Sequence, residues 1–206
     1  AQGGSDAVSR TALVDALKQR TGRVADWVNR DLTALGQEIS SRARSLRELK
    51  TYLEAKVATL ASTPTILPIK GLVTAGYGYR KSPFTGQREF HEGLDIAVPF
   101  GTPILATADG IVSFAGPLVA YGNVVFVDHG HGFATFYGHN STNRVREGQR
   151  VRRGDIVAYV GTTGRTTGPH VHYEVHIDGV ISNPLKYAID TSEIRFAGDA
   201  EPNSPS

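Results

Sequence analysis

The sequence contains no cysteine and no methionine, and each absence narrows what the protein can be. Without cysteine there is no disulfide, no thiolate nucleophile and no zinc–thiolate site, so any metal must be bound by histidine, aspartate or glutamate. Proteins of oxidising compartments often avoid unpaired thiols, which fits a location in the cell envelope. Because the sequence has no methionine and begins AQGGS, we expect a product processed or truncated from a precursor with an upstream signal or membrane anchor.

Long hydrophobic runs and a strong charge excess are also missing. The longest apolar runs, such as NVVFV, are far shorter than the roughly 20 residues that span a bilayer, so no membrane span is expected in these residues. The net charge is only +2, with 11 basic and 7 acidic side chains in residues 1–70 against 11 and 13 in residues 71–206. The basic excess of the first part is typical of a solvated helix face. The basic run at 144–153 has no interleaved aromatic residues to stack on bases, so no nucleic-acid partner is predicted.

Residues 8–62 are free of proline and carry apolar residues spaced by three and four, which predicts a long amphipathic helix. The near-heptad stripe consists of Val28, Leu32, Leu35, Ile39, Leu46, Leu49, Leu53 and Leu60. This spacing is typical of a coiled coil, and the stripe is too narrow to form a globular core alone. We expect this helical arm to pack on another helix, in a homodimer or with an envelope partner, or on the domain that follows. Gly22 interrupts the pattern and is a candidate turn between two helices.

The residue pattern changes after Pro64 and Pro68, which end the helical periodicity. Short apolar runs punctuated by glycine then predict six or more antiparallel strands. The predicted fold is an all-β domain preceded by a long amphipathic helical arm, α+β overall. The predicted boundaries are a disordered end at 1–7, the arm at 8–62, a linker at 63–71, the β-domain at 72–190 and a flexible tail at 191–206.

All seven histidines lie in the β-domain, and two of them stand in the stretch HVHYEV. His170 and His172 differ by two positions, so in a strand both side chains project from the same face, roughly 7 Å apart at Cα. They can converge on one ion or one substrate, or they can be two incidental histidines on a solvated face. His176 continues the same alternation.

A second motif, FHEGLDIA, places His91 and Asp95 four residues apart with Gly93 between them. This pair can bind a divalent cation from one turn and strand, or Asp95 can cap a turn beside a surface histidine. Two histidines and one carboxylate are a familiar ligand set for catalytic zinc, and the set leaves a coordination position open for water. Together with HVH, the motif favours a metal site.

Two further contexts contain histidine. In FYGHN, His139 stands where a strand ends in a loop, a common place for a catalytic group, although a turn histidine fits equally. In DHGHG, His129 and His131 are flanked by glycines and predict a hairpin turn instead of a metal site.

These motifs in combination closely resemble the lysostaphin/LytM-type zinc metallopeptidases, peptidase family M23, over roughly residues 71–187. The resemblance implies a compact antiparallel β-fold with a groove across the sheet, and cleavage of peptide cross-links in bacterial peptidoglycan. It implies Zn²⁺ bound by His91, Asp95 and His172, with His139 and His170 facing the reaction. It also implies a bacterial envelope location, in the periplasm or at the cell surface.

Four points stay open. Some members stabilise the oxyanion with a tyrosine six residues before the first ligand histidine, and Thr85 occupies that position here. Members cut glycine–glycine bridges or D-amino-acid cross-links, and no motif decides between them. Arg80 can orient an anionic group of the substrate or form a structural ion pair, and Thr166 and Thr167 can line the groove or form a plain turn.

Two other functions were weighed against the peptidase. Members with degenerate ligands activate partner amidases without cutting, but here every ligand position is filled. The strands also resemble the hammerhead hairpins of biotin or lipoyl carriers, which need a modified lysine at a hairpin tip. Residues 82–185 contain no lysine, so a carrier function is excluded.

Overall fold

The computed structural model describes residues 5–190 and 195–197 of the chain, and it divides the chain into two compact units, residues 1–55 and 56–206. Residues 1–4, 191–194 and 198–206 lie outside this description, and they include most of the two ends predicted to be disordered. Within those predicted ends, Ser5 already belongs to the first helix, and Arg195 and Phe196 form a short strand.

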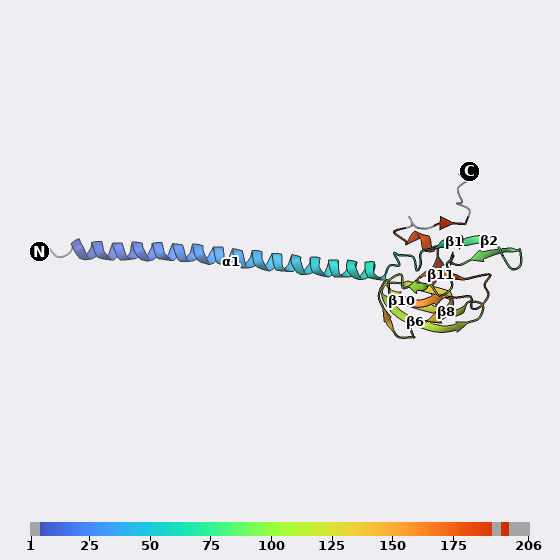
Figure 1. Cartoon of the computed structure of the whole chain (residues 1–206). Helices are drawn as coiled ribbons and strands as arrows, with labels where there is room; N and C mark the ends of the chain where they lie inside the picture. Colours follow the sequence, from blue (N-terminus) through green and yellow to red (C-terminus); the bar gives the residue numbers. More distant parts are fainter. Residues whose placement is uncertain (1–4, 191–194, 198–206) are drawn as a thin grey trace, which may run out of the picture. The chain divides into compact units, whose positions relative to one another are not determined.

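Helix α1 (Ser5–Ser62) is continuous (Figure 1). The turn predicted at Gly22 is wrong, because Gly22 and Gly36 both lie inside α1. Each glycine costs about 1 kcal/mol relative to alanine, a penalty that a long cooperative helix can absorb. Ion pairs four residues apart, such as Arg42 with Glu38 at 2.6 Å, add modest support.

The apolar stripe of α1 is solvated in the described part of the chain. Its eight side chains are between 38 and 66% exposed. None of the described helices is long and apolar enough to cross a membrane.

Arg153 caps the carboxyl end of α1. Its Nη2 donates to the carbonyl oxygens of Leu60 at 2.6 Å, Ala61 at 3.3 Å and Thr63 at 3.1 Å. The last carbonyls of a helix have no partner within the helix, and a cation complements their partial negative charge. Nothing in the basic run at 144–153 had indicated this role of Arg153.

The second unit is built from short strands, as predicted. They are β1 (Leu72–Ala75), β2 (Gly78–Lys81), β3 (Arg88–His91), β4 (Leu94–Ala97), β5 (Pro103–Leu105), β6 (Gly110–Leu118), β7 (Gly122–Gly130), β8 (Phe133–Asn143), β9 (Arg150–Val151), β10 (Ile156–Val160), β11 (His170–Ile177), β12 (Val180–Ser182) and β13 (Arg195–Phe196). A 3₁₀ turn, Pro184–Lys186, follows β12.

The main sheet has the order β13-β1-β4-β11-β8-β7-β6-β9, and its pairs are antiparallel except for β1 with β13. Strand β10 pairs with β5 and β8, β12 extends β11, and β2 and β3 form a separate hairpin. A long helix followed by an antiparallel β-domain confirms the predicted fold class. Strands β4, β11 and β8 are neighbours in the middle of this sheet, and they carry most of the predicted site.

Alternation along β4 and β11 separates the core from the site. Leu94, Ile96, Val171 and Tyr173 are buried in the hydrophobic core. Because side chains alternate between the two faces of a strand, the residues between them face the opposite side. Those residues are Asp95, His170, His172, Glu174 and His176.

The hairpin predicted for DHGHG is confirmed, since β7 and β8 pair on either side of it. His131 lies in the turn with a φ of 51°. His129 is buried, its Nδ1 donates to the carbonyl oxygen of Asp109 at 2.8 Å, and its Nε2 lies 2.7 Å from the Thr135 hydroxyl. This histidine is part of the polar interior of the fold.

Candidate active site

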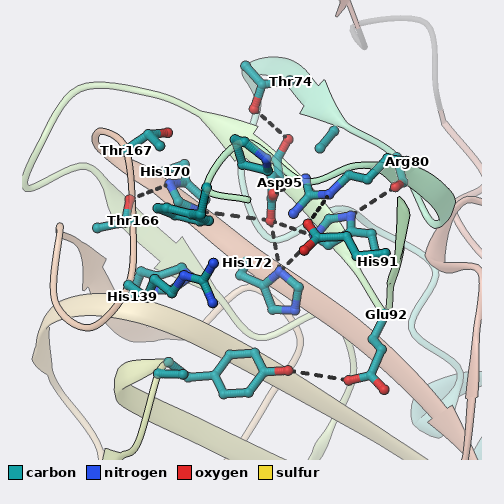
Figure 2. A pocket seen from close by; sticks show the side chains of 18 of the residues that line it. Thr74, Arg80, His91, Glu92, Asp95, His139, Thr166, Thr167, His170 and His172 are labelled. Atoms are coloured by element: carbon teal, nitrogen blue, oxygen red, sulfur yellow. Dashed lines mark hydrogen bonds and ion pairs between the residues drawn. The ribbon is translucent and has the colours of Figure 1, made fainter. Parts of the chain in front are cut away.

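The five side chains predicted for the site line one cleft with a volume of about 640 Å³ (Figure 2). They are His91 at the end of β3, Asp95 on β4, His139 on β8, and His170 and His172 on β11. The strand register places His172 opposite Asp95 on one side and Gly138 on the other. Sheet pairing thus brings together three motifs that are far apart in the sequence.

Three of these side chains converge on one point. His91 Nε2 lies 3.1 Å from Asp95 Oδ1 and 3.2 Å from His172 Nδ1, and the last two atoms are 2.7 Å apart. All three residues are buried, and their ligand atoms lie within 4.8 Å of one another. The set therefore has the composition and the convergence of a metal-binding site.

The hydrogen bonds around this cluster decide which atoms carry lone pairs. His91 Nδ1 donates to the carbonyl oxygen of Gly76 at 2.8 Å, so in the neutral ring Nε2 is an acceptor. His172 Nε2 lies 2.8 Å from the Glu174 carboxylate, so in the neutral ring Nδ1 is an acceptor. Three acceptors then face each other, an arrangement that is repulsive until a cation is bound between them. The residues present therefore fit a divalent metal, and two histidines with one carboxylate suit zinc.

The electrostatics of the cluster favour positive charge at the same place. Burial alone would lower the pKa of His172, but its hydrogen bonds to Asp95 and Glu174 raise it to about 9. Burial opposes ionisation of Asp95 as well, yet its close side-chain contacts with His172 and His91 hold its pKa far below the usual range. Two carboxylates on either side of one imidazole thus attract a cation.

Residues behind the ligands hold them in place. Glu174 is buried and bridges His172 and His176, its Oε2 lying 2.7 Å from His176 Nε2. Burial opposes its ionisation, but these two histidines lower the pKa of Glu174 to about 2. A carboxylate that accepts from the outer nitrogen of a ligand histidine fixes the ring and strengthens it as a ligand. No sequence motif singled out Glu174, although it shares the strand face of His170 and His172.

Arg80 forms ion pairs with two carboxylates. Its Nη1 lies 3.1 Å from Asp95 Oδ2, and its Nε lies 3.1 Å from Glu89 Oε1. Of the two interpretations open for Arg80, the structural ion pair is the one observed. It leaves Asp95 Oδ1 as the oxygen that faces the histidines.

Gly93 matters for the space it leaves. A Cβ at this position would lie 2.6 Å from the carbonyl oxygen of Tyr173 and 2.7 Å from the His172 ring. The missing side chain of Gly93 is therefore what lets His172 approach the loop between His91 and Asp95.

His139 and His170 stand beside the cluster, with ring centroids 4.7 Å apart. His139 Nδ1 donates to the carbonyl oxygen of Thr163 and His170 Nδ1 to that of Gly168, both at 2.8 Å. In each neutral ring Nε2 is left as the proton acceptor. Burial lowers the pKa of His139 to about 4, against the opposing effect of its bond to Thr163, so this imidazole is neutral near pH 7.

The backbone around His139 is unusual. Its φ is 61°, a left-handed conformation that few residues other than glycine adopt, and its N–H donates to the carbonyl oxygen of Tyr121 at 2.8 Å. A Cβ on Gly164 would lie 2.4 Å from the backbone nitrogen of Gly122. The loops at 120–122 and 163–165 therefore pack backbone against backbone, and both hold His139 through hydrogen bonds.

Tyr121 is a cleft residue that the sequence analysis did not single out. Its ring stacks near His139 with centroids 6.3 Å apart, and its hydroxyl donates to Glu92 at 3.3 Å. Burial raises the pKa of Tyr121, so the hydroxyl stays a donor. Thr85 lies in the turn between β2 and β3 and is not among the described residues that line the cleft, whereas Thr166 and Thr167 are.

The β-domain is similar to known peptidases. The family model of peptidase family M23 matches residues 89–184. The DD-carboxypeptidase/endopeptidase Mpg of Neisseria meningitidis is 42% identical over 128 residues, which is 62% of this chain and 30% of that protein. A zinc-containing peptidase from Vibrio cholerae is 34% identical with a TM-score of 0.56, over 60% of this chain and 40% of that one.

The decisive match is to a variant of the catalytic domain of the prophage-encoded M23 protein EnpA from Enterococcus faecalis. It is 35% identical with a TM-score of 0.52, and the match covers 59% of this chain and 97% of that domain. The chain belongs to peptidase family M23. The resemblance noted from the motifs is thereby confirmed, and the M23 match falls entirely within the β-domain. The chain spans less than a third of the length of its Neisseria relative.

Proposed function

We propose that this M23 domain is a zinc-dependent endopeptidase that hydrolyses peptide cross-links of bacterial peptidoglycan. The observation that carries the proposal is the convergence of three ligand atoms next to two histidines whose Nδ1 atoms are bound to backbone carbonyls, all in one cleft. The names of related proteins support the same substrate, since one is a peptidoglycan DD-endopeptidase of Vibrio cholerae, ShyC, 41% identical over 105 residues. Such a substrate implies an envelope location, in the periplasm or at the cell surface.

In the proposed mechanism, His91, Asp95 and His172 hold the zinc. Zinc bound there supplies positive charge that polarises the scissile carbonyl and makes water more acidic. Glu174 and Arg80 fix the ligands through the contacts described for His172 and Asp95.

His139 and His170 handle the proton. With Nδ1 of each ring bound to a backbone carbonyl, Nε2 is free to accept a proton from the attacking water. The protonated imidazole then returns that proton to the leaving nitrogen. The low pKa of His139 keeps its ring neutral and able to accept at neutral pH.

The test separates metal binding from proton transfer. Purified peptidoglycan is digested with the zinc-loaded protein, and bound zinc is measured by elemental analysis. We expect His139→Ala and His170→Ala to retain stoichiometric zinc and to lose about 10²- to 10⁴-fold in rate, because positioned acid–base groups contribute that much. His91→Ala and His172→Ala should lose the metal.

Two results would contradict the proposal. Full activity in the His170→Ala protein with zinc bound would refute the role of that histidine. Bound zinc without any released fragments from the wild-type protein would instead support a non-catalytic envelope regulator that binds peptidoglycan or activates an amidase.

The helical arm is proposed to pair with the arm of a second copy. Its apolar positions from Val28 to Leu60 are spaced by four and three except where Arg42 and Lys56 occupy the stripe, and this near-heptad spacing is typical of a supercoiled helix pair. The apolar side chains of the stripe are more than a third exposed in the single chain. An envelope partner with a similar helix is the other candidate occupant.

A further inference from the structure

Three basic side chains line the cleft, and they differ in what they contact. Arg80 is engaged by Glu89 and Asp95. Lys81 and Arg165 line the cleft as well, and within the described residues no carboxylate forms an ion pair with either of them. In the described part of the chain, Arg165 and Lys81 therefore line the cleft without a direct ion pair, and Glu89 interacts with Arg165 only through longer-range electrostatic attraction.

Arg165 is held in a defined position despite its exposure. Its guanidinium carbon lies 4.1 Å from the centroid of the Phe84 ring, and its backbone N–H donates to the carbonyl oxygen of Ala120 at 2.8 Å. Stacking on an aromatic face leaves the N–H edge of a guanidinium free, and that edge matches a planar carboxylate with two parallel hydrogen bonds. The preceding Gly164 fixes the loop by its close backbone contact with Gly122.

The loop of Arg165 forms the cleft wall next to His170. Thr166 follows Arg165, and its Oγ1 lies 3.1 Å from His170 Nδ1 (Figure 2). If His170 and its neighbour His139 return a proton to the leaving nitrogen, the residue that departs lies on this side of the cleft. A carboxylate next to that nitrogen then lies in the same cleft that Arg165 lines.

We propose that Arg165 selects substrates in which the departing residue carries a free carboxylate beside the leaving nitrogen. The inference rests on the proposed peptidase function and narrows it. A terminal D-amino acid, or a cross-linked one that keeps its α-carboxylate, has this group. A residue inside a glycine bridge does not, so the inference favours D-amino-acid peptides over glycine bridges.

The test uses two probes that differ only in this group, N-acetyl-D-alanyl-D-alanine and its C-terminal carboxamide. Cleavage rates and dissociation constants are measured for the zinc-loaded wild-type chain and for Arg165→Gln. We expect the variant to lose about ten- to a hundredfold in kcat/KM and in affinity for the acid, the usual worth of a charge-assisted pair, with little change for the amide.

Arg88→Gln is the matched control, because Arg88 also stacks on an aromatic ring, 4.0 Å from the Tyr79 centroid, but does not line the cleft. It should behave as wild type with both probes. Equal losses for acid and amide, no loss at all, or the same loss in Arg88→Gln would overturn the role of Arg165.

The outcomes also separate this inference from the function on which it rests. Digestion of peptidoglycan without any preference between acid and amide would leave the peptidase standing and refute the selectivity. If the wild-type protein cut nothing, the dissociation constants would still decide whether Arg165 distinguishes the two probes.

Discussion

The helical arm and the β-domain use their apolar residues in opposite ways. In the β-domain, Ile104 and Val171 have no exposed surface at all, and the strands bury their apolar face against one another. In α1, Leu46 and Leu49 are 66 and 52% exposed although they belong to the most regular apolar pattern of the chain. The apolar stripe of a single helix thus needs a partner to be buried. The apolar faces of the strands, by contrast, bury one another within one domain.

The largest expected effect on stability comes from replacing a large apolar side chain with alanine, and it should differ between the β-domain and the arm. Ile104→Ala should lower the free energy of unfolding of the β-domain by about 2–5 kcal/mol, because it removes buried methyl groups and leaves a cavity. Leu49→Ala should leave that transition unchanged and weaken self-association instead. Urea denaturation measures the free energy of unfolding, and sedimentation equilibrium measures self-association.

If Leu49→Ala destabilised the β-domain as much as Ile104→Ala does, the apolar stripe of the arm would contribute to the stability of the β-domain, which would contradict the contrast between the two regions. A wild-type protein that is monomeric at all accessible concentrations would refute pairing of the arm with a second copy.

A smaller effect is expected behind the metal cluster. Glu174→Gln keeps the shape of the side chain but removes the charge that holds His172, so zinc affinity should fall about 10- to 100-fold, the usual cost of losing such a partner. Competition with a chelator measures the affinity. Glu54→Gln is the control, since Glu54 is an exposed acidic residue of the arm, and zinc affinity unchanged in both variants would contradict the role of Glu174.

The smallest expected effect is a pH dependence confined to the β-domain, because the arm contains no histidine. Burial lowers the pKa of His129 below its ordinary value, so below about pH 6.5 the unfolded chain binds a proton that the folded domain excludes. The stability from the neutral ring is present above that pH and declines as the pH falls, by at most about 1.4 kcal/mol per unit.

Urea denaturation of wild type and His129→Gln between pH 5.5 and 7.5 isolates this contribution, since both proteins share the other histidines. Wild type should have the steeper loss of stability toward low pH. Equal slopes would show that His129 is no harder to protonate in the folded state than in the unfolded one.

The sequence predicted the residues of the site better than the contacts between them. His91, Asp95, His139, His170 and His172 were named from short motifs, because a spacing of two on a strand is a local property. Their roles as ligands and proton carriers stay predictions. That these residues would line one cleft followed from the family resemblance, since the register of β4, β8 and β11 is a long-range property.

Other features were hidden for the same reason. Glu174 shares the strand face of His172, but nothing local indicates that it is buried and bonded to two histidines. The pairing of Arg80 with Asp95 requires the β2–β3 hairpin to fold over β4. At Gly22 the local penalty was overestimated, because one glycine weakens a long helix without ending it.

The left-handed backbone of His139 costs conformational stability at a residue whose imidazole lies in the cleft. Glycine adopts such a φ without the penalty of roughly 1 kcal/mol that a side chain incurs, so conformational preference alone would select glycine there. The imidazole is therefore best explained by what its ring does in the cleft. The surrounding loops compensate for a strained position that a protein selected only for thermal endurance would have no reason to keep.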